Sequence, residues 1–180
     1  MKRWGFNKME QFNILDESGA VIGKASREEC HGGSFLLHGV VHVLVFNSHG
    51  DVLLQKRSMT KYIQPGKWDT SIGGHIHCSE TKEEALKRET EEELAISGAV
   101  LEKIYEYIMV SDVEKEYVTT YRCVWDGPIT FQKSEIDGVR FFSPDEIESH
   151  LGSGYFTPNF EEEWEYYIKW VKRKEKENIE

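Results

Sequence analysis

Residues 74–96 of this chain read GHIHCSETKEEALKRETEEELAI, and the rest of the sequence is interpreted around them. Gly73 and Gly74, at the start of this stretch, give the backbone freedom to adopt unusual dihedral angles after a short strand. Thr81 is followed three residues later by Glu84, which is the pattern of a capping box. We therefore predict a helix that begins here and runs to about Leu94.

The predicted helix has one apolar stripe and one acidic stripe. At about 100° per residue, Leu86, Thr90 and Leu94 share a face that is narrow but sufficient to pack on a sheet. The next stripe carries three carboxylates at spacings i, i+3 and i+4: Glu89, Glu92 and Glu93. Like charges at these spacings oppose a helix by roughly 0.2–0.5 kcal/mol per pair, so we expect an additional positive charge at this face.

Two interpretations of the acidic stripe follow. Seven glutamates lie within the fourteen residues 80–93, and the default for such a run is a solvated helix face. A divalent cation such as Mg²⁺ or Mn²⁺ is the alternative, because these ions take oxygen ligands from a few carboxylates and from substrate phosphate. The charge pattern alone does not choose between a solvated helix and a metal-bound phosphate.

Length and composition place further limits on the chain. At 180 residues it fits a single domain, residues 1–180, and its three cysteines cannot all pair with one another, which favours a reducing compartment. The N-terminal residues lack the apolar region of a secretory signal, and the longest apolar run, 40–46, is too short to span a membrane. A net charge of −10 disfavours nucleic acid and anionic membranes as partners. We expect a cytoplasmic protein.

The remaining segments predict a mixed sheet with helices packed on it. Two hairpins are expected, with strands at 12–16 and 21–25 and at 40–47 and 51–56, and the second is apolar enough to form the central pair of the sheet. Further short strands are expected at 70–73, 101–110, 117–125 and 139–142. Ser143 and Pro144 begin a helix, and a final amphipathic helix at 160–172 precedes a frayed charged tail.

The spacing of the whole stretch, Gly74, then Glu80, then RETEEELAI from Arg88, resembles the signature box of the Nudix hydrolases. Two positions depart from that box: Thr90 replaces an aliphatic residue, and Ala95 replaces a glycine. We expect Ala95 to be tolerated because the helix ends there without a positive φ. The resemblance implies an α/β/α sandwich with a mixed sheet, and hydrolysis of a diphosphate bond in a nucleoside diphosphate derivative or a related small compound.

The resemblance also implies roles within the box, residues 74–96. Mg²⁺ or Mn²⁺ would be held by Glu89, Glu92 and Glu93 together with the carbonyl of Gly74, and would bridge the diphosphate and activate a water molecule. Two further residues are expected to orient the box by pairing with each other: Glu80 and Arg88. A general base is also required, and Glu114 and Glu116 are the candidates, with metal ligation or solvent exposure as equal alternatives.

Outside the box, the chain resembles the branch that contains the type I isopentenyl diphosphate isomerases and their hydrolase relatives, from about residue 12 to residue 160. The resemblance rests on segments such as LDE at 15–17, LLQKR at 53–57 and PGKWD at 65–69. In those isomerases three histidines and two glutamates hold a metal, and the matching residues here are His31, His38, His75, Glu114 and Glu116. Imidazole and carboxylate ligands suit a transition metal. Taken singly, each histidine has a structural or surface role as its alternative. The other four histidines match nothing and are expected to be structural or surface residues.

Cations are needed for the substrate phosphates. By the same resemblance, Arg27, Arg57 and Lys61 stand where the isomerases bind diphosphate, and an arginine can do so with two hydrogen bonds. Surface ion pairs are the alternative for each.

Three positions separate hydrolysis from isomerisation. Gly73 stands where the isomerases have a catalytic cysteine, Glu89 where they have an arginine, and Asn159 where they have an aromatic residue. These departures favour a hydrolase. The alternatives are an isopentenyl diphosphate isomerase-like enzyme with a different acid, and a non-catalytic module that binds a nucleotide. The leaving group and the oligomeric state stay open.

Overall fold

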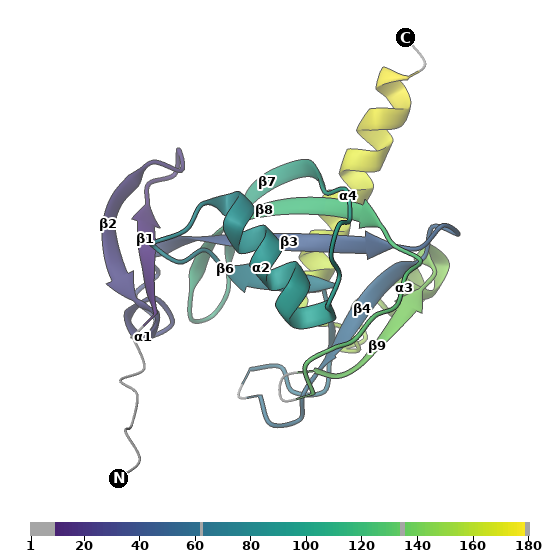
Figure 1. Cartoon of the computed structure of the whole chain (residues 1–180), viewed down its shortest axis with the longest axis horizontal. Coiled ribbons are helices and arrows are strands. Elements are labelled where there is room, and N and C mark those ends of the chain that lie inside the picture. Colours follow the sequence, from purple (N-terminus) through teal and green to yellow (C-terminus); the bar gives the residue numbers. More distant parts are fainter. Residues whose placement is uncertain (1–9, 62, 134–135, 179–180) are drawn as a thin grey trace.

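The computed structural model describes residues 10–61, 63–133 and 136–178, and its central element is one mixed sheet of nine strands (Figure 1). The expectations for the N-terminal residues and the last two residues of the tail lie outside the described part. The strands are β1 Gln11–Leu15, β2 Val21–Ser26, β3 Leu37–Phe46, β4 Val52–Arg57, β5 Trp68–Asp69, β6 Ile72–His75, β7 Glu102–Val110, β8 Lys115–Val124 and β9 Ile136–Phe142. The helices are α1 Arg27–Cys30, α2 Lys82–Leu94, α3 Pro144–His150 and α4 Pro158–Glu177.

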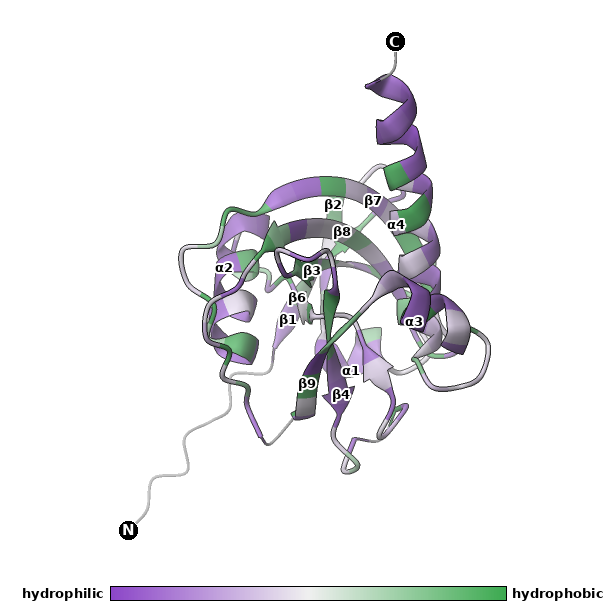
Figure 2. Ribbon diagram, turned by 90° about the vertical axis from the view of Figure 1, so that its right-hand side faces the viewer, coloured by the Kyte–Doolittle hydropathy of each residue, from purple (hydrophilic) through white to green (hydrophobic). Residues whose placement is uncertain are grey.

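Helices cover both faces of the sheet, which confirms the expected α/β/α arrangement (Figure 2). On one face, Leu86 and Leu94 of α2 pack against Val41 and Val43 of β3. On the other face, Phe160 and Trp164 of α4 pack in a second cluster with residues of β3, β4 and β9, which are Leu44, Leu54 and Phe142. Because successive side chains of a strand point to opposite faces, β3 supplies both clusters and lies between the two layers.

Strand β3 is fully buried and organises the sheet. It runs parallel to β8 over its whole length, from Leu37 opposite Lys115 to Phe46 opposite Val124. Along β6 it runs antiparallel, with Val41 opposite Gly74. Strand β3 therefore fixes the positions of β6 and β8, and β6 contributes residues to both candidate sites described in the next section.

The expected first hairpin is confirmed as β1 and β2. The second hairpin is only partly correct, because β3 and β4 form a register pair only at Phe46 and Val52 and then separate. Beyond that pair, β4 takes β5 and β9 as its partners, whereas β3 takes β6 and β8. Apolar composition correctly indicated buried strands, but it does not encode which strand lies beside which.

Helix α2 confirms the predicted capping box, since Thr81 accepts a hydrogen bond from Glu84 N and Glu84 accepts one from Thr81 N. The expectation for its end is wrong. Ala95 has a φ of 53°, in the left-handed region, and its N–H donates to the carbonyl of Glu91 at 3.0 Å. A non-glycine residue there costs roughly 1–2 kcal/mol, and the turn lets Ile96, which is 1% exposed, enter the core.

Helix α4 is longer than expected, because the segment predicted to fray is helical as far as Glu177. Ion pairs support this part of the helix: Lys174 Nζ lies 2.8 Å from Glu177, and Arg173 Nε lies 3.9 Å from the same carboxylate. Each exposed pair contributes about 0.3–0.5 kcal/mol. None of the helices in the described part of the chain has the length and apolar composition that crossing a membrane requires.

Candidate functional site

The acidic face of α2 is fixed to strand β6 through one glycine. A Cβ added to Gly74 would lie 1.9 Å from Cδ of Glu89, so the carboxyl group occupies the space where any side chain at position 74 would stand. Burial raises the pKa of Glu89, although the guanidinium of Arg88, 2.5 Å away, acts in the opposite direction. A buried carboxylate of this kind is stabilised by a cation.

Arg88 and Glu80 pair as the sequence predicts. Nη2 of Arg88 lies 2.6 Å from Oε1 of Glu80, and its Nε donates to the other carboxylate oxygen at 3.1 Å. Nη2 also donates to the carbonyl of His75 at 3.0 Å. These bonds tie the helix to the loop that precedes it and to the end of β6, which orients the box.

The two remaining carboxylates of the stripe differ in their surroundings. The side chain of Glu92 is 59% exposed and forms an ion pair with Arg88, at 3.5 Å. Glu93 lies deeper, and its Oε2 accepts hydrogen bonds from Gln55 Nε2 at 3.1 Å and from the backbone N–H of Gly73 at 3.4 Å. The amide of Gln55 thus orients a candidate ligand, a role that sequence reasoning did not assign and for which the sequence carried no signal.

Glu89 and Glu93 therefore lie against the backbone of Gly74 and Gly73, while Glu92, on the same stripe of α2, contacts Arg88; we call these three residues the carboxylate row. The set offers oxygen ligands only, which is the donor set that Mg²⁺ and Mn²⁺ prefer. Gly74 leaves room for Glu89 to reach the backbone, and burial raises the pKa of that carboxyl group. These features fit the divalent cation that the Nudix resemblance implies.

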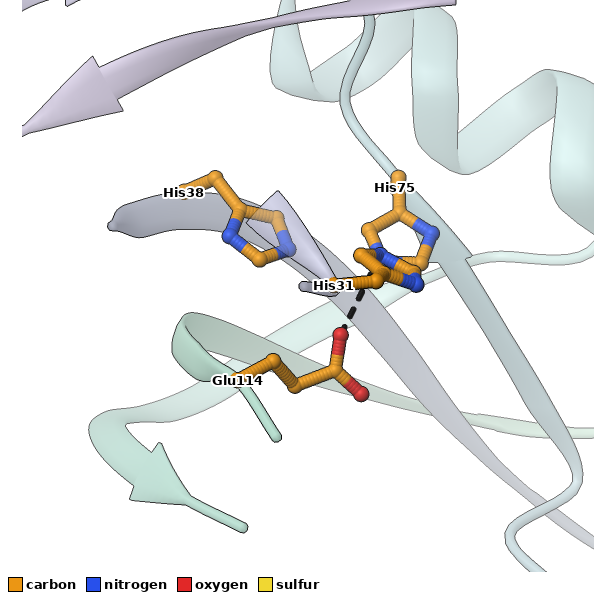
Figure 3. Close-up of side chains that lie close together, drawn as sticks. All are labelled: His31, His38, His75 and Glu114. Atoms are coloured by element: carbon orange, nitrogen blue, oxygen red, sulfur yellow. Dashed lines mark hydrogen bonds and ion pairs between the residues drawn. The ribbon is translucent and has the colours of Figure 1, made fainter. Parts of the chain in front are cut away.

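A second cluster of candidate ligands includes His75, the last residue of β6. His31 follows α1, His38 lies in β3, His75 ends β6 and Glu114 precedes β8. One ligand atom from each of the four lies within 4.8 Å of all the others, and their side chains point toward one another (Figure 3). Four segments that are distant in the sequence thus converge on one point.

The distances within this histidine cluster are short. Nε2 of His31 lies 3.1 Å from Nε2 of His75 and 3.1 Å from Oε2 of Glu114. Nδ1 of His38 donates to the carbonyl of Leu36 at 2.9 Å, which leaves Nε2 of that ring as a lone-pair donor. Among the described residues, Nε2 of His38 and Oε2 of Glu114 are buried without a hydrogen-bond partner. A metal ion would satisfy both.

Glu116, the fifth predicted ligand, lies beside this cluster. It stands opposite His38 in the β3–β8 register, and its Oε1 lies 3.4 Å from Nε2 of His75 and 4.0 Å from Nε2 of His38. Burial would raise its pKa, but the hydrogen bond and charge of His75 lower it. Glu116 is therefore a carboxylate in contact with the ligand nitrogens.

The protonation states suit metal ligation. Burial, with the charge of His75 as a second cause, lowers the pKa of His31 to about 4, and burial also lowers that of His38. Both imidazoles are then neutral near pH 7, the form that binds metal. Burial and the charge of Glu116 raise the pKa of Glu114 to about 7.

Two of the three basic residues predicted to bind diphosphate, both arginines, pair with carboxylates outside the two clusters. Nη1 of Arg27 pairs with Glu10 at 2.9 Å, and its side chain is 52% exposed. Nη1 of Arg57 pairs with Asp69 at 3.2 Å. Lys61 is half-buried. For the two arginines, the structure shows ion pairs, and the substrate contacts of all three residues stay predictions.

A surface cavity of about 780 Å³ lies at the far end of β3, around Phe46, Arg122, Trp125 and Tyr167. It contains neither the carboxylate row nor the histidine cluster. The chemistry of the two ligand clusters, rather than the size of this cavity, locates the candidate site.

The chain is similar to known proteins in both sequence and fold. The NUDIX domain family profile matches residues 36–167. A Yersinia pestis protein named an uncharacterized Nudix hydrolase is 31% identical over 151 residues, which cover 84% of this chain and 81% of the relative.

Two solved structures share the fold. DR0079 from Deinococcus radiodurans superposes with a TM-score of 0.72 at 23% identity, over 82% of this chain and 92% of that one. The NUDIX domain of Shewanella oneidensis NrtR, solved in complex with ADP ribose, superposes with a TM-score of 0.58 at 17% identity, over 76% of this chain and 86% of that one. With its signature box complete at every charged position, the chain belongs to the Nudix hydrolase family.

Proposed function

We propose that this protein is a divalent-metal-dependent diphosphohydrolase that cleaves a diphosphate bond in a nucleoside diphosphate derivative or a related small diphosphate compound. The observation that carries the proposal is the Glu89 carboxyl group in the space left by the missing Cβ of Gly74, with Glu93 bonded to the neighbouring Gly73 N–H. Oxygen ligands of this kind support Mg²⁺ or Mn²⁺ together with substrate phosphate.

The three carboxylates of the row are held in place by different neighbours. Glu93, oriented by Gln55 and by the N–H of Gly73, is the best-positioned ligand. Glu89 and Glu92 complete the row with the Gly74 carbonyl, while Arg88 and Glu80 hold the helix in register with β6. When bound, the cation neutralises charge on the diphosphate and lowers the pKa of a water molecule.

The general base is proposed to come from the strand-β8 side of the site. Glu114 and Glu116 are the candidates, and the pKa of Glu114, raised to about 7, is near the value at which a carboxylate accepts a proton efficiently at neutral pH. Both also contact the histidine cluster. We therefore propose two roles for this pair, proton acceptance or ligation of a transition metal together with His31, His38 and His75.

The histidine cluster is also the observation that favours the second candidate, an isopentenyl diphosphate isomerase-like enzyme. Against it, Gly73 provides no acid or base. Incubation of isopentenyl diphosphate in deuterated water would reveal an isomerase through label in the allylic product, and we expect none.

The substrate class is tested with a panel of nucleotides, dinucleotides, nucleotide sugars including ADP-ribose, and prenyl diphosphates, each with Mg²⁺ or Mn²⁺. ADP-ribose is included because the NrtR domain was solved with it. Release of phosphate, or of a nucleoside monophosphate, is expected from at least one nucleoside diphosphate derivative and only with metal. Binding without turnover across the panel would instead support a non-catalytic nucleotide-binding module.

A further inference from the structure

A buried ion pair near the box has no part in the proposed function so far. Glu163 of α4 is completely buried, and its Oε2 bonds to Nδ1 of His42 in β3. The same carboxylate accepts hydrogen bonds from Thr120 Oγ1 at 2.7 Å, Tyr105 OH at 3.1 Å and Tyr107 OH at 3.4 Å. These contacts fix both the carboxylate and the orientation of the imidazole ring.

The ring carries a positive charge at neutral pH. Burial alone would lower the pKa of His42, but the charge and hydrogen bond of Glu163 outweigh it and raise the pKa to about 9. For Glu163, burial would raise the pKa, and the charge and hydrogen bond of His42 lower it. With Nδ1 bonded to the carboxylate, Nε2 of the imidazolium is a second hydrogen-bond donor.

That second donor faces Gly73. Cδ2 and Nε2 of His42 lie 3.4 and 3.5 Å from the position that a Cβ of Gly73 would occupy, so no side chain at residue 73 covers this edge of the ring. In the described part of the chain, no group accepts a hydrogen bond from Nε2, and this atom is not sealed from solvent, although the side chain is only 9% exposed. A charged donor at such an opening is suited to an anionic ligand.

A second polar group near the same glycine also lacks a partner. Among the described residues, Oγ1 of Thr70 is buried without a hydrogen bond. Its Cγ2 lies 3.6 Å from the same Cβ position of Gly73. Gly73 is thus flanked by the open Nε2 edge of His42 and by Thr70, whose hydroxyl is unsatisfied.

Gly73 connects this spot to the carboxylate row. Its backbone N–H donates to Oε2 of Glu93 at 3.4 Å, and the next residue, Gly74, supplies the carbonyl proposed as a metal ligand. A diphosphate held beside Glu93 would therefore have oxygens close to Gly73.

We propose that His42, held by Glu163, contacts the substrate directly: its Nε2–H donates to an anionic oxygen of the diphosphate beside Gly73, with the Thr70 hydroxyl as a second donor. This inference rests on the proposed diphosphate hydrolysis. It explains why residue 73 is a glycine, since a larger side chain would lie between the ring and the ligand. A purely structural pair that joins α4 to β3, with water at Nε2, is the competing explanation.

The test measures binding of inorganic pyrophosphate to the Mn²⁺-loaded protein by titration calorimetry, after the affinity for Mn²⁺ alone. His42→Phe keeps a ring but removes the donor and the charge, and we expect pyrophosphate to bind about tenfold to a hundredfold more weakly. Thr70→Val should weaken it by about threefold to tenfold. Tyr107→Phe is the matched control, because it removes a hydrogen bond to Glu163 but leaves Nε2 in place, and it should bind like the wild type. Mn²⁺ affinity should be unchanged in all three.

Each outcome has one meaning. If folded His42→Phe and Thr70→Val bind pyrophosphate as tightly as the wild type, the pair is only structural and the inference is wrong. If His42→Phe does not fold, Thr70→Val and Glu163→Gln decide the question by the same measurement. A wild type that binds Mn²⁺ but no pyrophosphate overturns this inference, whereas one that binds no Mn²⁺ overturns the proposed function as well.

Discussion

The carboxylate row and the histidine cluster meet strand β6 at neighbouring residues, and they differ in the ligand atoms that they offer. The row presents oxygen atoms from consecutive turns of one helix, one of them 59% exposed. The cluster presents three imidazoles and a carboxylate from four segments, with His38 completely buried. Adjacent residues of β6, Gly74 and His75, thus belong to different sites. One short strand can thus support a hard-cation site and a softer one.

The substitution with the largest expected effect on the carboxylate row alone fills the space at Gly74. In Gly74→Ala the new Cβ would lie 1.9 Å from Cδ of Glu89, so this flexible side chain must move away from the row. We expect the affinity for Mn²⁺ and the turnover to fall by on the order of tenfold to a hundredfold, with the fold retained. Titration calorimetry measures the affinity for Mn²⁺, and steady-state kinetics measures the turnover.

Gly138→Ala is the matched control for that change, because nothing lies within 4 Å of a Cβ at this strand position. It should leave both quantities unchanged. If Gly74→Ala and Gly138→Ala had the same Mn²⁺ affinity and turnover, the position of Glu89 beside the β6 backbone would not matter for metal binding.

The second prediction addresses the histidine cluster alone. His31→Gln removes one of the convergent nitrogens, at a partly exposed position where the core is little disturbed. We expect the affinity for Zn²⁺ to fall on the order of tenfold, while Mn²⁺-dependent turnover from the row persists. His49→Gln, at an exposed turn, serves as the control. If His31→Gln and His49→Gln bind Zn²⁺ equally, the cluster is not a metal site.

The smallest expected effect concerns stability and pH. The folded-state pKa of His42 is about 9, above its ordinary value of 6.5, so the stability contributed by its charge is complete below pH 6.5 and is lost as the pH rises through 9. The free energy of unfolding should fall across this window by at most about 1.4 kcal/mol per pH unit. Urea denaturation at several pH values measures it, and the slope should be smaller in Glu163→Gln. The same slope in both proteins would contradict the charged pair.

The two sites also differ in how far the sequence could predict them. The capping box at Thr81 and the spacing of the glutamates are local patterns, so the helix and its acidic face followed from residue spacing alone. The histidine cluster has no such pattern, because its members are brought together by the register of β3 with β6 and β8. Its residues were named only through the resemblance to a known branch of proteins.

The misjudged features share one physical cause, which is tertiary packing. The left-handed conformation of Ala95 is imposed by the burial of Ile96 and overrides the usual preference for glycine. The partners of β4 depend on how the whole sheet is arranged. The pair of His42 and Glu163 joins residues that are 121 positions apart, and nothing in the sequence links them.

The central claim is that the carboxylate row binds the cation that hydrolysis requires. The most direct test replaces Glu93, which receives hydrogen bonds from Gln55 and Gly73, by glutamine, and compares it with Glu91→Gln, an exposed position on the same helix. Turnover of the best substrate of the panel is followed against Mn²⁺ concentration, with circular dichroism as the check of folding. We predict that Glu93→Gln folds but loses metal-dependent turnover, while Glu91→Gln behaves like the wild type. Full metal-dependent turnover in folded Glu93→Gln would contradict the claim.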